Sequence, residues 1–113
     1  MLVTIYHNPR CSKSRKALEL LENKDINLNI IPYLDQGICV KDVLLLAKRL
    51  NLNVVDFMRK KEDEFKALSF DTTNNEDCAK AIESHPKLLE RPIVMIGEKA
   101  IIARPPEDLE KLF

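Results

Sequence analysis

The sequence predicts a single mixed α/β domain, and three observations support this. The first 34 residues show the pattern strand, helix, strand. The segment from about 38 to 88 repeats apolar side chains at helical spacing. Two apolar runs near the end flank Gly97-Glu98 and precede a short helical stretch. The order β-α-β, helices, β-β-α describes a thioredoxin-like fold with a central mixed sheet and a helical insertion over about 38–88.

The opening strand covers about residues 2–6, where β-branched and aromatic side chains alternate before the breaker pair Asn8-Pro9. A helix follows from Ser12 or Ser14, either of which could cap it. Its apolar stripe recurs at i, i+3 and i+4, at Ala17, Leu20 and Leu21. Residues 26–31 then alternate apolar side chains with asparagine, which predicts a second strand. We expect the two strands to be parallel, because a helix connects them in a right-handed crossover.

The middle of the chain is predicted to be helical. One apolar stripe consists of Val43, Leu46, Ala47 and Leu50. A further helical stretch begins near Val54, and Asn74 could cap a third helix that ends at His85-Pro86. The charge run 60–64 alternates in sign, so we expect it to be a solvated turn.

The last part of the chain predicts a hairpin followed by a helix. Residues 92–96 and 99–103 are apolar runs separated by two residues, and glycine first in that pair is typical of a type II′ turn. These runs are expected to be antiparallel strands. Pro105-Pro106 then opens a short final helix, since proline is tolerated in the first turn.

Length and charge exclude several classes of protein. The 113 residues are enough for one self-sufficient domain but not two. Eighteen basic residues balance 18 acidic ones, so no net field attracts nucleic acid or an anionic membrane. The longest apolar run, Val43 to Ala47, is far shorter than the ~20 residues of a spanning helix. We therefore expect no nucleic-acid or membrane partner. We also expect the protein to be a monomer.

The cysteine count points to a reducing compartment. Three cysteines without a C-x-x-C pair argue against a disulfide framework and against a structural zinc site. The start of the chain lacks the basic leader of a secretory signal, so we expect a cytoplasmic protein. No ligand cluster and no glycine-rich nucleotide loop are present in the sequence, and we expect no bound metal or flavin.

Cys11 is the strongest candidate for chemistry. It follows the first strand and precedes the first helix, so its sulfur lies at the positive end of the helix dipole, where a thiolate is favoured. His7, Arg10, Lys13 and Arg15 add positive charge nearby. Ser14 can donate its hydroxyl to the sulfur, although it could equally be only an early helix residue.

The other two cysteines are interpreted differently. Cys78 lies on an apolar helical stripe and is predicted to be a buried structural residue. Cys39 has no charged neighbour before Lys41 and is predicted to be inert. Position 14 is serine where a dithiol oxidoreductase carries its second cysteine. A nucleophile that forms an adduct and is released by an external thiol is therefore favoured over a dithiol cycle.

Three arginines stand apart from the alternating Lys/Glu pattern. Arg59 follows Phe57-Met58, whereas Arg91 and Arg104 each precede a proline, which restricts their backbones. Taken singly, each arginine is more often a surface salt-bridge donor. Together with Cys11 they would form an oxyanion pocket, because a guanidinium matches a tetrahedral oxyanion bidentately.

The sequence also resembles a known family. The segments His7-Asn8-Pro9-Arg10-Cys11-Ser12-Lys13-Ser14-Arg15, Glu90-Arg91-Pro92-Ile93-Val94 and Arg104-Pro105-Pro106-Glu107 are similar to those of the glutaredoxin-coupled (ArsC-type) arsenate reductases. The resemblance runs from residue 2 to the end, and it is to a short-chain member of that family.

The resemblance implies a thioredoxin-like fold and a specific chemistry. A single essential cysteine attacks arsenate, and the arsenic(V) adduct is reduced to arsenite by glutathione and glutaredoxin, with no bound cofactor. Cys11 matches the nucleophile, His7 the residue that helps to lower its pKa, and Ser14 the hydroxyl near the thiolate. The three oxyanion-binding arginines are matched by Arg59, Arg91 and Arg104.

Two other functions stay open at this point. Spx-type transcription regulators, which bind RNA polymerase, share a similar fold and an Arg-Pro-Ile-like segment, but they carry a C-x-x-C pair where this sequence has Ser14. A monothiol oxidoreductase acting on glutathione mixed disulfides would also use one cysteine, and it would need a glutathione groove.

Overall fold

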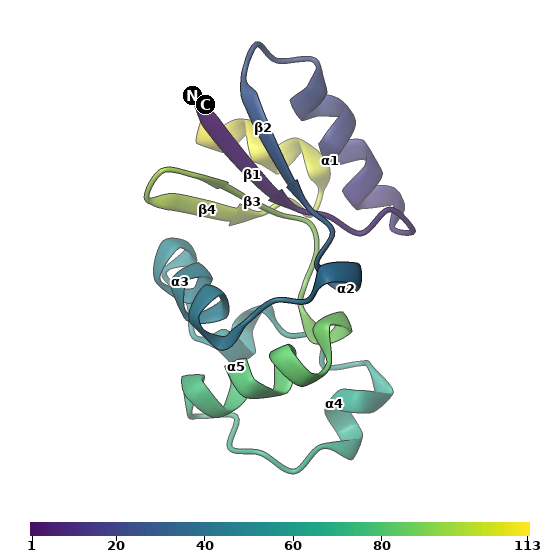
Figure 1. The fold of residues 1–113 in the computed structure, drawn as a ribbon, viewed down its shortest axis with the longest axis vertical. Helices are drawn as coiled ribbons and strands as arrows, with labels where there is room; N and C mark the ends of the chain where they lie inside the picture. The colour runs from purple at the N-terminus through teal and green to yellow at the C-terminus, as the bar shows by residue number, and fades with distance from the viewer. The chain divides into compact units, whose positions relative to one another are not determined.

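A computed structural model describes all 113 residues (Figure 1). The elements, in which η denotes a 3-10 helix, are β1 (Leu2–Tyr6), α1 (Ser12–Glu22), β2 (Asn27–Ile31), α2 (Tyr33–Gln36), α3 (Val40–Leu50), η1 (Val54–Phe57), α4 (Asp63–Ala67), α5 (Asn75–Ser84), η2 (Pro86–Leu88), β3 (Ile93–Ile96), β4 (Lys99–Ile102) and η3 (Pro106–Leu112). They form two units. The sheet unit comprises residues 1–36 and 91–113, and the helical unit comprises residues 37–90.

The sheet unit contains four strands in the order β2-β1-β3-β4. β1 is parallel to β2, with Leu2 opposite Asn27 and Tyr6 opposite Ile31. β3 is antiparallel to both of its neighbours, β1 and β4. The predicted mixed sheet is therefore confirmed, including the parallel β-α-β opening.

One face of this sheet is covered by α1 and η3, which also contact each other (Figure 1). Alternate positions of the strands point toward the two helices because successive strand side chains face opposite sides of the sheet. The fully buried residues of this core are Val3, Ile5, Ala17, Leu21, Val94, Ala103 and Leu109. Ala17 and Leu21, two residues of the apolar stripe predicted for the first helix, thus pack α1 against the sheet.

The hairpin between β3 and β4 turns at Gly97-Glu98. Gly97 has a φ of 56°, and the one non-glycine residue with positive φ is Asn51, so Glu98 has negative φ. This combination is that of a type II′ turn, as predicted. The Arg91–Pro92 and Arg104–Pro105 peptide bonds are both cis.

The helical unit is built around α3 and α5, which pack against each other. α3 buries Val43, Leu46 and Ala47, three of the four residues of the predicted stripe. Asn74 caps α5 and its side chain accepts the backbone N–H of Asp77, as the sequence suggested. The helices expected over about 38–88 are therefore present, while the prediction that the whole chain is one domain stays a prediction.

One local expectation was wrong, and three local features were not specified by the sequence. Neither Ser12 nor Ser14 caps α1, because Cys11 occupies the N-cap position and Ser14 is buried in the first turn. The short helix α2 was not predicted. The charge run 60–64 forms the expected turn over residues 60–62, and α4 begins at Asp63. The alternation of β2 does not translate into burial, since β2 is an edge strand and Ile30 is 42% exposed.

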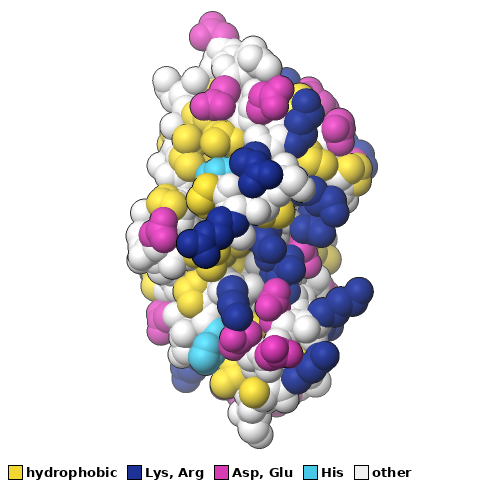
Figure 2. Space-filling view, turned by 90° about the vertical axis from the view of Figure 1, so that its right-hand side faces the viewer, with side chains coloured by type: hydrophobic (Ala, Val, Ile, Leu, Met, Phe, Trp, Pro, Cys, Tyr) yellow, Lys and Arg dark blue, Asp and Glu magenta, His cyan; other side chains and the backbone are white.

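The surface carries mixed charge. On the face drawn in Figure 2, acidic side chains are interspersed among the Lys and Arg side chains. None of the helices is long and apolar enough to cross a membrane.

Candidate active site

The turn between β1 and α1 places Cys11 at the start of the helix. The Cys11 backbone N–H donates to the Asn8 carbonyl at 3.0 Å, and the Asn8 side-chain oxygen accepts the Arg10 N–H at 3.0 Å. The Cys11 carbonyl then accepts the Arg15 N–H at 2.9 Å. The thiol consequently lies next to the unpaired N–H groups of the first helical turn, as predicted from the sequence.

The pKa of the Cys11 thiol is lowered from its ordinary value. Burial by itself raises this pKa, but hydrogen bonds from the backbone N–H groups of Ser14 and Lys13 act against it. The Arg91 guanidinium also hydrogen-bonds to the sulfur and adds its positive charge, and together these groups outweigh burial. The arrangement therefore favours a thiolate, the form that acts as a nucleophile.

Ser14 and His7 form a buried pair beside this turn. Ser14 Oγ lies 2.6 Å from His7 Nδ1 and accepts the Asn8 backbone N–H at 3.0 Å. His7, Asn8 and Ser14 are all buried. Ser14 thus contacts the sulfur through its backbone N–H, while its hydroxyl bonds to His7 and Asn8.

The pKa of His7 is lowered from its ordinary value of 6.5. Burial is the largest cause, and the positive charge of Arg15 acts in the same direction against the attraction of Glu22. The lowered pKa favours the neutral form of the imidazole. Its Nδ1 lies against the Ser14 hydroxyl, so the contact of His7 in this turn is with Ser14.

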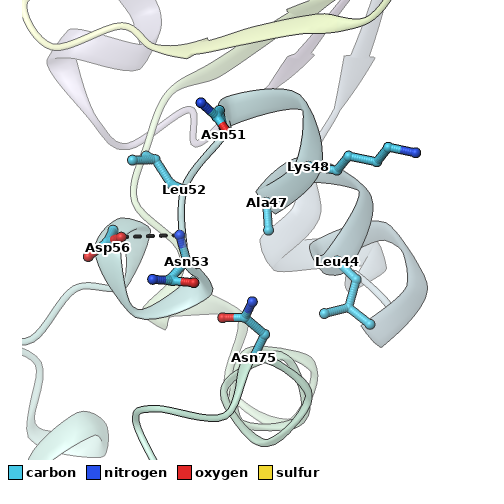
Figure 3. Close-up of a pocket in the computed structure, with 8 residues that line it drawn as sticks. All are labelled: Leu44, Ala47, Lys48, Asn51, Leu52, Asn53, Asp56 and Asn75. Carbon is cyan, nitrogen blue, oxygen red and sulfur yellow. Dashed lines mark hydrogen bonds between the residues drawn. The ribbon is translucent and has the colours of Figure 1, made fainter.

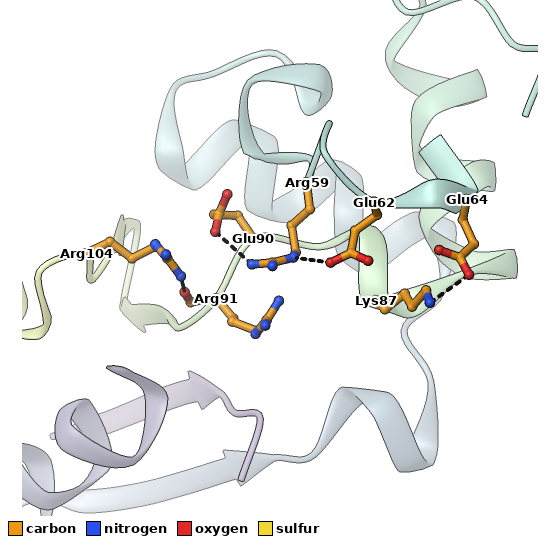
Figure 4. A network of polar contacts seen from close by, with 7 residues as sticks. All are labelled: Arg59, Glu62, Glu64, Lys87, Glu90, Arg91 and Arg104. Atoms are coloured by element: carbon orange, nitrogen blue, oxygen red, sulfur yellow. Dashed lines mark hydrogen bonds and ion pairs between the residues drawn. The ribbon is translucent and has the colours of Figure 1, made fainter. Parts of the chain in front are cut away.

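Arg91 and Arg104 lie in the same unit as Cys11. Arg91 reaches the sulfur, and its Nε is buried without a hydrogen-bond partner. Arg104 Nη1 donates to the Arg91 backbone carbonyl at 3.0 Å (Figure 4). The structure therefore joins Cys11, Arg91 and Arg104 through successive contacts.

Arg59, the third predicted arginine, belongs to the helical unit. Its Nε is 3.0 Å from Glu62 Oε1 and its Nη1 is 3.5 Å from Glu90 Oε1 (Figure 4). Arg59 is thus an ion-pair donor, which is the more common role of a single arginine. Its participation in an oxyanion site stays a prediction.

Cys39 and Cys78 have surroundings unlike those of Cys11. Cys39 is exposed at the start of α3. Cys78 is buried, and its thiol donates to the Asp71 and Thr72 carbonyls at 3.7 and 3.5 Å. Burial, followed by the charges of Asp71 and Asp77, raises the pKa of the Cys78 thiol, which disfavours its thiolate.

A hollow of about 460 Å³ lies in the helical unit (Figure 3). It is lined by Leu44, Ala47, Lys48, Asn51, Leu52, Asn53, Asp56 and Asn75, none of which is a predicted site residue. Several of its polar side chains serve the backbone. Asn53 and Asp56 form a capping box for η1, and Asn75 Oδ1 accepts the Val54 N–H at 3.0 Å. The hollow therefore does not compete with Cys11 as a reactive site.

Comparison with known proteins gives consistent results. The model of the ArsC family matches residues 6–112. An arsenate reductase of Haemophilus influenzae is 46% identical over 110 residues, 95% of each chain, and one of Neisseria meningitidis serogroup A is 42% identical over 111 residues, 96% of this chain and 95% of that one. The solved structure of an arsenate reductase from Vibrio cholerae has a TM-score of 0.88 at 40% identity, and the match covers 100% of this chain and 98% of that one.

Proposed function

Because this chain belongs to the ArsC family, a family of thioredoxin-like fold, we propose that it reduces arsenate with the Cys11 thiolate as nucleophile. One observation carries the proposal most directly. The Cys11 thiol has a lowered pKa and a guanidinium, that of Arg91, in contact with its sulfur. A nucleophile and an oxyanion-binding group are thus adjacent, which is the arrangement that attack on an anion requires.

Arg91 is assigned the central role in binding the oxyanion. Its buried, unpartnered Nε is a donor that an arsenate oxygen would satisfy, and a buried donor without a partner costs about 1–3 kcal/mol. Arg104 supports it by holding the Arg91 carbonyl, and Arg59 is proposed as the third arginine of the site. His7 and Ser14 are proposed to fix the turn that holds Cys11, since their side chains bond to each other and to the Asn8 N–H.

The first step forms a sulfur–arsenic bond. The thiolate attacks arsenic, and one arsenate oxygen leaves as water after a proton from solvent has been taken up. Arsenic stays in the +5 state in the resulting adduct. Arg91 neutralises the charge of the anion in this step, because its guanidinium is positively charged.

External thiols supply the two electrons. Glutathione displaces a second oxygen as water, and a glutaredoxin thiolate then attacks the glutathione sulfur. The electron pair of the arsenic–sulfur bond stays on arsenic, which becomes +3, and hydrolysis releases arsenite and restores Cys11. In total, one arsenate and two thiols give one arsenite, one disulfide and one water.

External reduction fits the positions of the cysteines. Position 14 is serine, and Cys39 and Cys78 both belong to the helical unit, so the turn of Cys11 holds no second thiol. The reaction is assigned to the cytoplasm, where glutathione keeps thiols reduced. The relatives described above are arsenate reductases and favour neither an Spx-type regulator nor a monothiol disulfide oxidoreductase.

A turnover assay with arsenate, glutathione and glutaredoxin tests this proposal. Wild-type protein is expected to form arsenite, and Cys11→Ser is expected to lose at least about a hundredfold in rate, because serine is a far weaker nucleophile at neutral pH. Cys39→Ser is the matched control and should retain wild-type activity, as should Cys78→Ser if it stays folded. Loss of activity in folded Cys39→Ser or Cys78→Ser would contradict the single-cysteine mechanism.

A further inference from the structure

Two carboxylates hold the guanidinium of Arg59. Glu62 contacts its Nε at 3.0 Å and Glu90 contacts its Nη1 at 3.5 Å, as Figure 4 shows. The three side chains are only 23%, 27% and 25% exposed, respectively. Ion pairs shielded to this degree are less weakened by solvent than fully exposed ones.

The backbone fixes the positions of all three residues. Met58 and Leu89 form an antiparallel bridge. On one side of it, the Arg59 N–H donates to the Leu88 carbonyl at 2.7 Å. On the other side, the Glu90 N–H donates to the Phe57 carbonyl at 2.9 Å. Glu62 follows in a turn closed by its own N–H, which donates to the Arg59 carbonyl at 3.2 Å. The contacts of Arg59 are therefore built into the fold of the helical unit.

These contacts limit what else Arg59 can bind. A guanidinium grips an oxyanion bidentately with two of its nitrogens, either Nε with Nη2 or Nη1 with Nη2. In this structure each of those pairs includes one nitrogen that already bonds to a carboxylate. The two carboxylates also outweigh the single positive charge of Arg59, which weakens its attraction for a further anion.

We propose that Glu62 and Glu90 act as a carboxylate clamp that competes with the oxyanion for Arg59, and that Glu90 is the side chain which the oxyanion displaces. Glu90 is assigned this role because its contact is the longer of the two. The inference rests on the proposed function, in which Arg59 is one of the oxyanion-binding arginines. It makes Glu90 a determinant of substrate affinity, and it sets arsenate binding against an internal ion pair.

Calorimetric titration of arsenate into full-length Cys11→Ser protein measures this competition without covalent chemistry. Adding Glu90→Gln removes one competing charge and keeps the shape of the side chain. We expect arsenate to bind about threefold tighter, because a competing and partly exposed ion pair is removed. Glu62→Gln should act in the same direction.

Glu64→Gln provides the matched control. Glu64 lies two residues from Glu62 and pairs with Lys87 at 2.6 Å instead of with Arg59. This substitution removes the same charge from the segment that contains Glu62, so it should leave arsenate affinity unchanged if direct competition at Arg59 is the cause. An equal gain in affinity from Glu64→Gln would overturn the clamp in favour of a general charge effect.

The remaining outcomes also decide the question. Unchanged or weaker binding in Glu90→Gln, or no arsenate binding by either protein, would overturn the clamp. Turnover measured with protein that retains Cys11 tests the proposed function separately from the clamp. Turnover with unchanged affinity in Glu90→Gln would reject the clamp alone, whereas tighter binding without any turnover would reject the reductase activity alone.

Discussion

The acidity of Cys11 depends on its immediate contacts. Burial raises the pKa of the thiol, and the groups that overcome burial are two backbone N–H groups and Arg91. Arg15, another cation near in sequence, is directed elsewhere, since its Nη1 donates to the Pro9 carbonyl at 2.9 Å. An ion or hydrogen bond at contact distance outweighs exposed charges that water screens.

Replacing Arg91 is therefore expected to raise the pKa of Cys11. Arg91→Gln removes a charged donor that favours the thiolate, so burial opposes ionisation with less compensation. Less thiolate is then present at pH 7, and the curve of alkylation rate against pH should move to higher pH. Iodoacetamide labelling of Cys11, followed by peptide mass spectrometry across a pH series, measures this shift.

Arg10→Gln is the control for this substitution. Arg10 adjoins Cys11 in the sequence, but its side chain is exposed and is not among the groups that alter the pKa of the thiol. The alkylation curve of this variant should coincide with that of the wild type. A larger shift in Arg10→Gln than in Arg91→Gln would show that general positive charge, and not contact with Arg91, sets the acidity of Cys11.

At the residue scale, the sequence identifies Cys11 but not all the partners of the site. The position of Cys11 between a strand and a helix is a local property, which alternation and breaker residues reveal. Glu62 lies three residues from Arg59, a spacing that can be recognised in the sequence. Glu90 is 31 residues away, and its contact depends on the bridge between Met58 and Leu89. The partner of the Ser14 hydroxyl is set by the path of the loop, because His7 lies directly after β1 and Ser14 lies in the first turn of α1.

At the element scale, α1 and η3 together support the sheet on which the site is built. α1 starts at the site and buries Ala17 and Leu21, and η3 buries Leu109 in the same core. The Lys24 ammonium adds surface contacts to this end of the chain, with Glu110 at 2.9 Å and the Phe113 ring centroid at 4.3 Å. The short 3-10 helix is therefore part of the structure that supports Cys11.

Leu109→Ala tests this role of η3. Leu109 is fully buried, so its truncation is expected to lower the free energy of unfolding by about 2–5 kcal/mol. Leu112→Ala is the control, since Leu112 is only partly buried and should cost less. Urea denaturation measures both, with the midpoint shifted and the slope unchanged. Equal effects of the two substitutions would contradict the assignment of Leu109 to the core.

Elements with a clear period are predictable, and those held by longer-range contacts are not. The strands and the helices α1, α3 and α5 follow from alternation, apolar stripes and the Asn74 cap. α2 spans four residues, which is too short for a helical period to be visible. The burial of β2 depends on its place at the edge of the sheet, and a strand's own sequence does not reveal whether it is central.

At the scale of the whole molecule, the charge composition determines how the protein can bind an anion. Balanced charge gives the chain no general attraction for polyanions, so anion binding has to come from particular arginines. Arg91 lies in the sheet unit with Cys11, and Arg59 lies in the helical unit with its two carboxylates. The resemblance between the sequence and the ArsC family, which rests on segments at both ends of the chain, is confirmed by the match over residues 6–112.

Protection of Cys11 by arsenate is the most direct test of the central claim that its thiolate and the oxyanion share one site. Wild-type protein without external thiols is labelled with iodoacetamide at increasing arsenate concentration, and the modification of each cysteine is followed by peptide mass spectrometry. Cys11 labelling should slow saturably, while labelling of the exposed Cys39 should not change. Labelling of Cys11 at one constant rate over the whole arsenate series would contradict the claim.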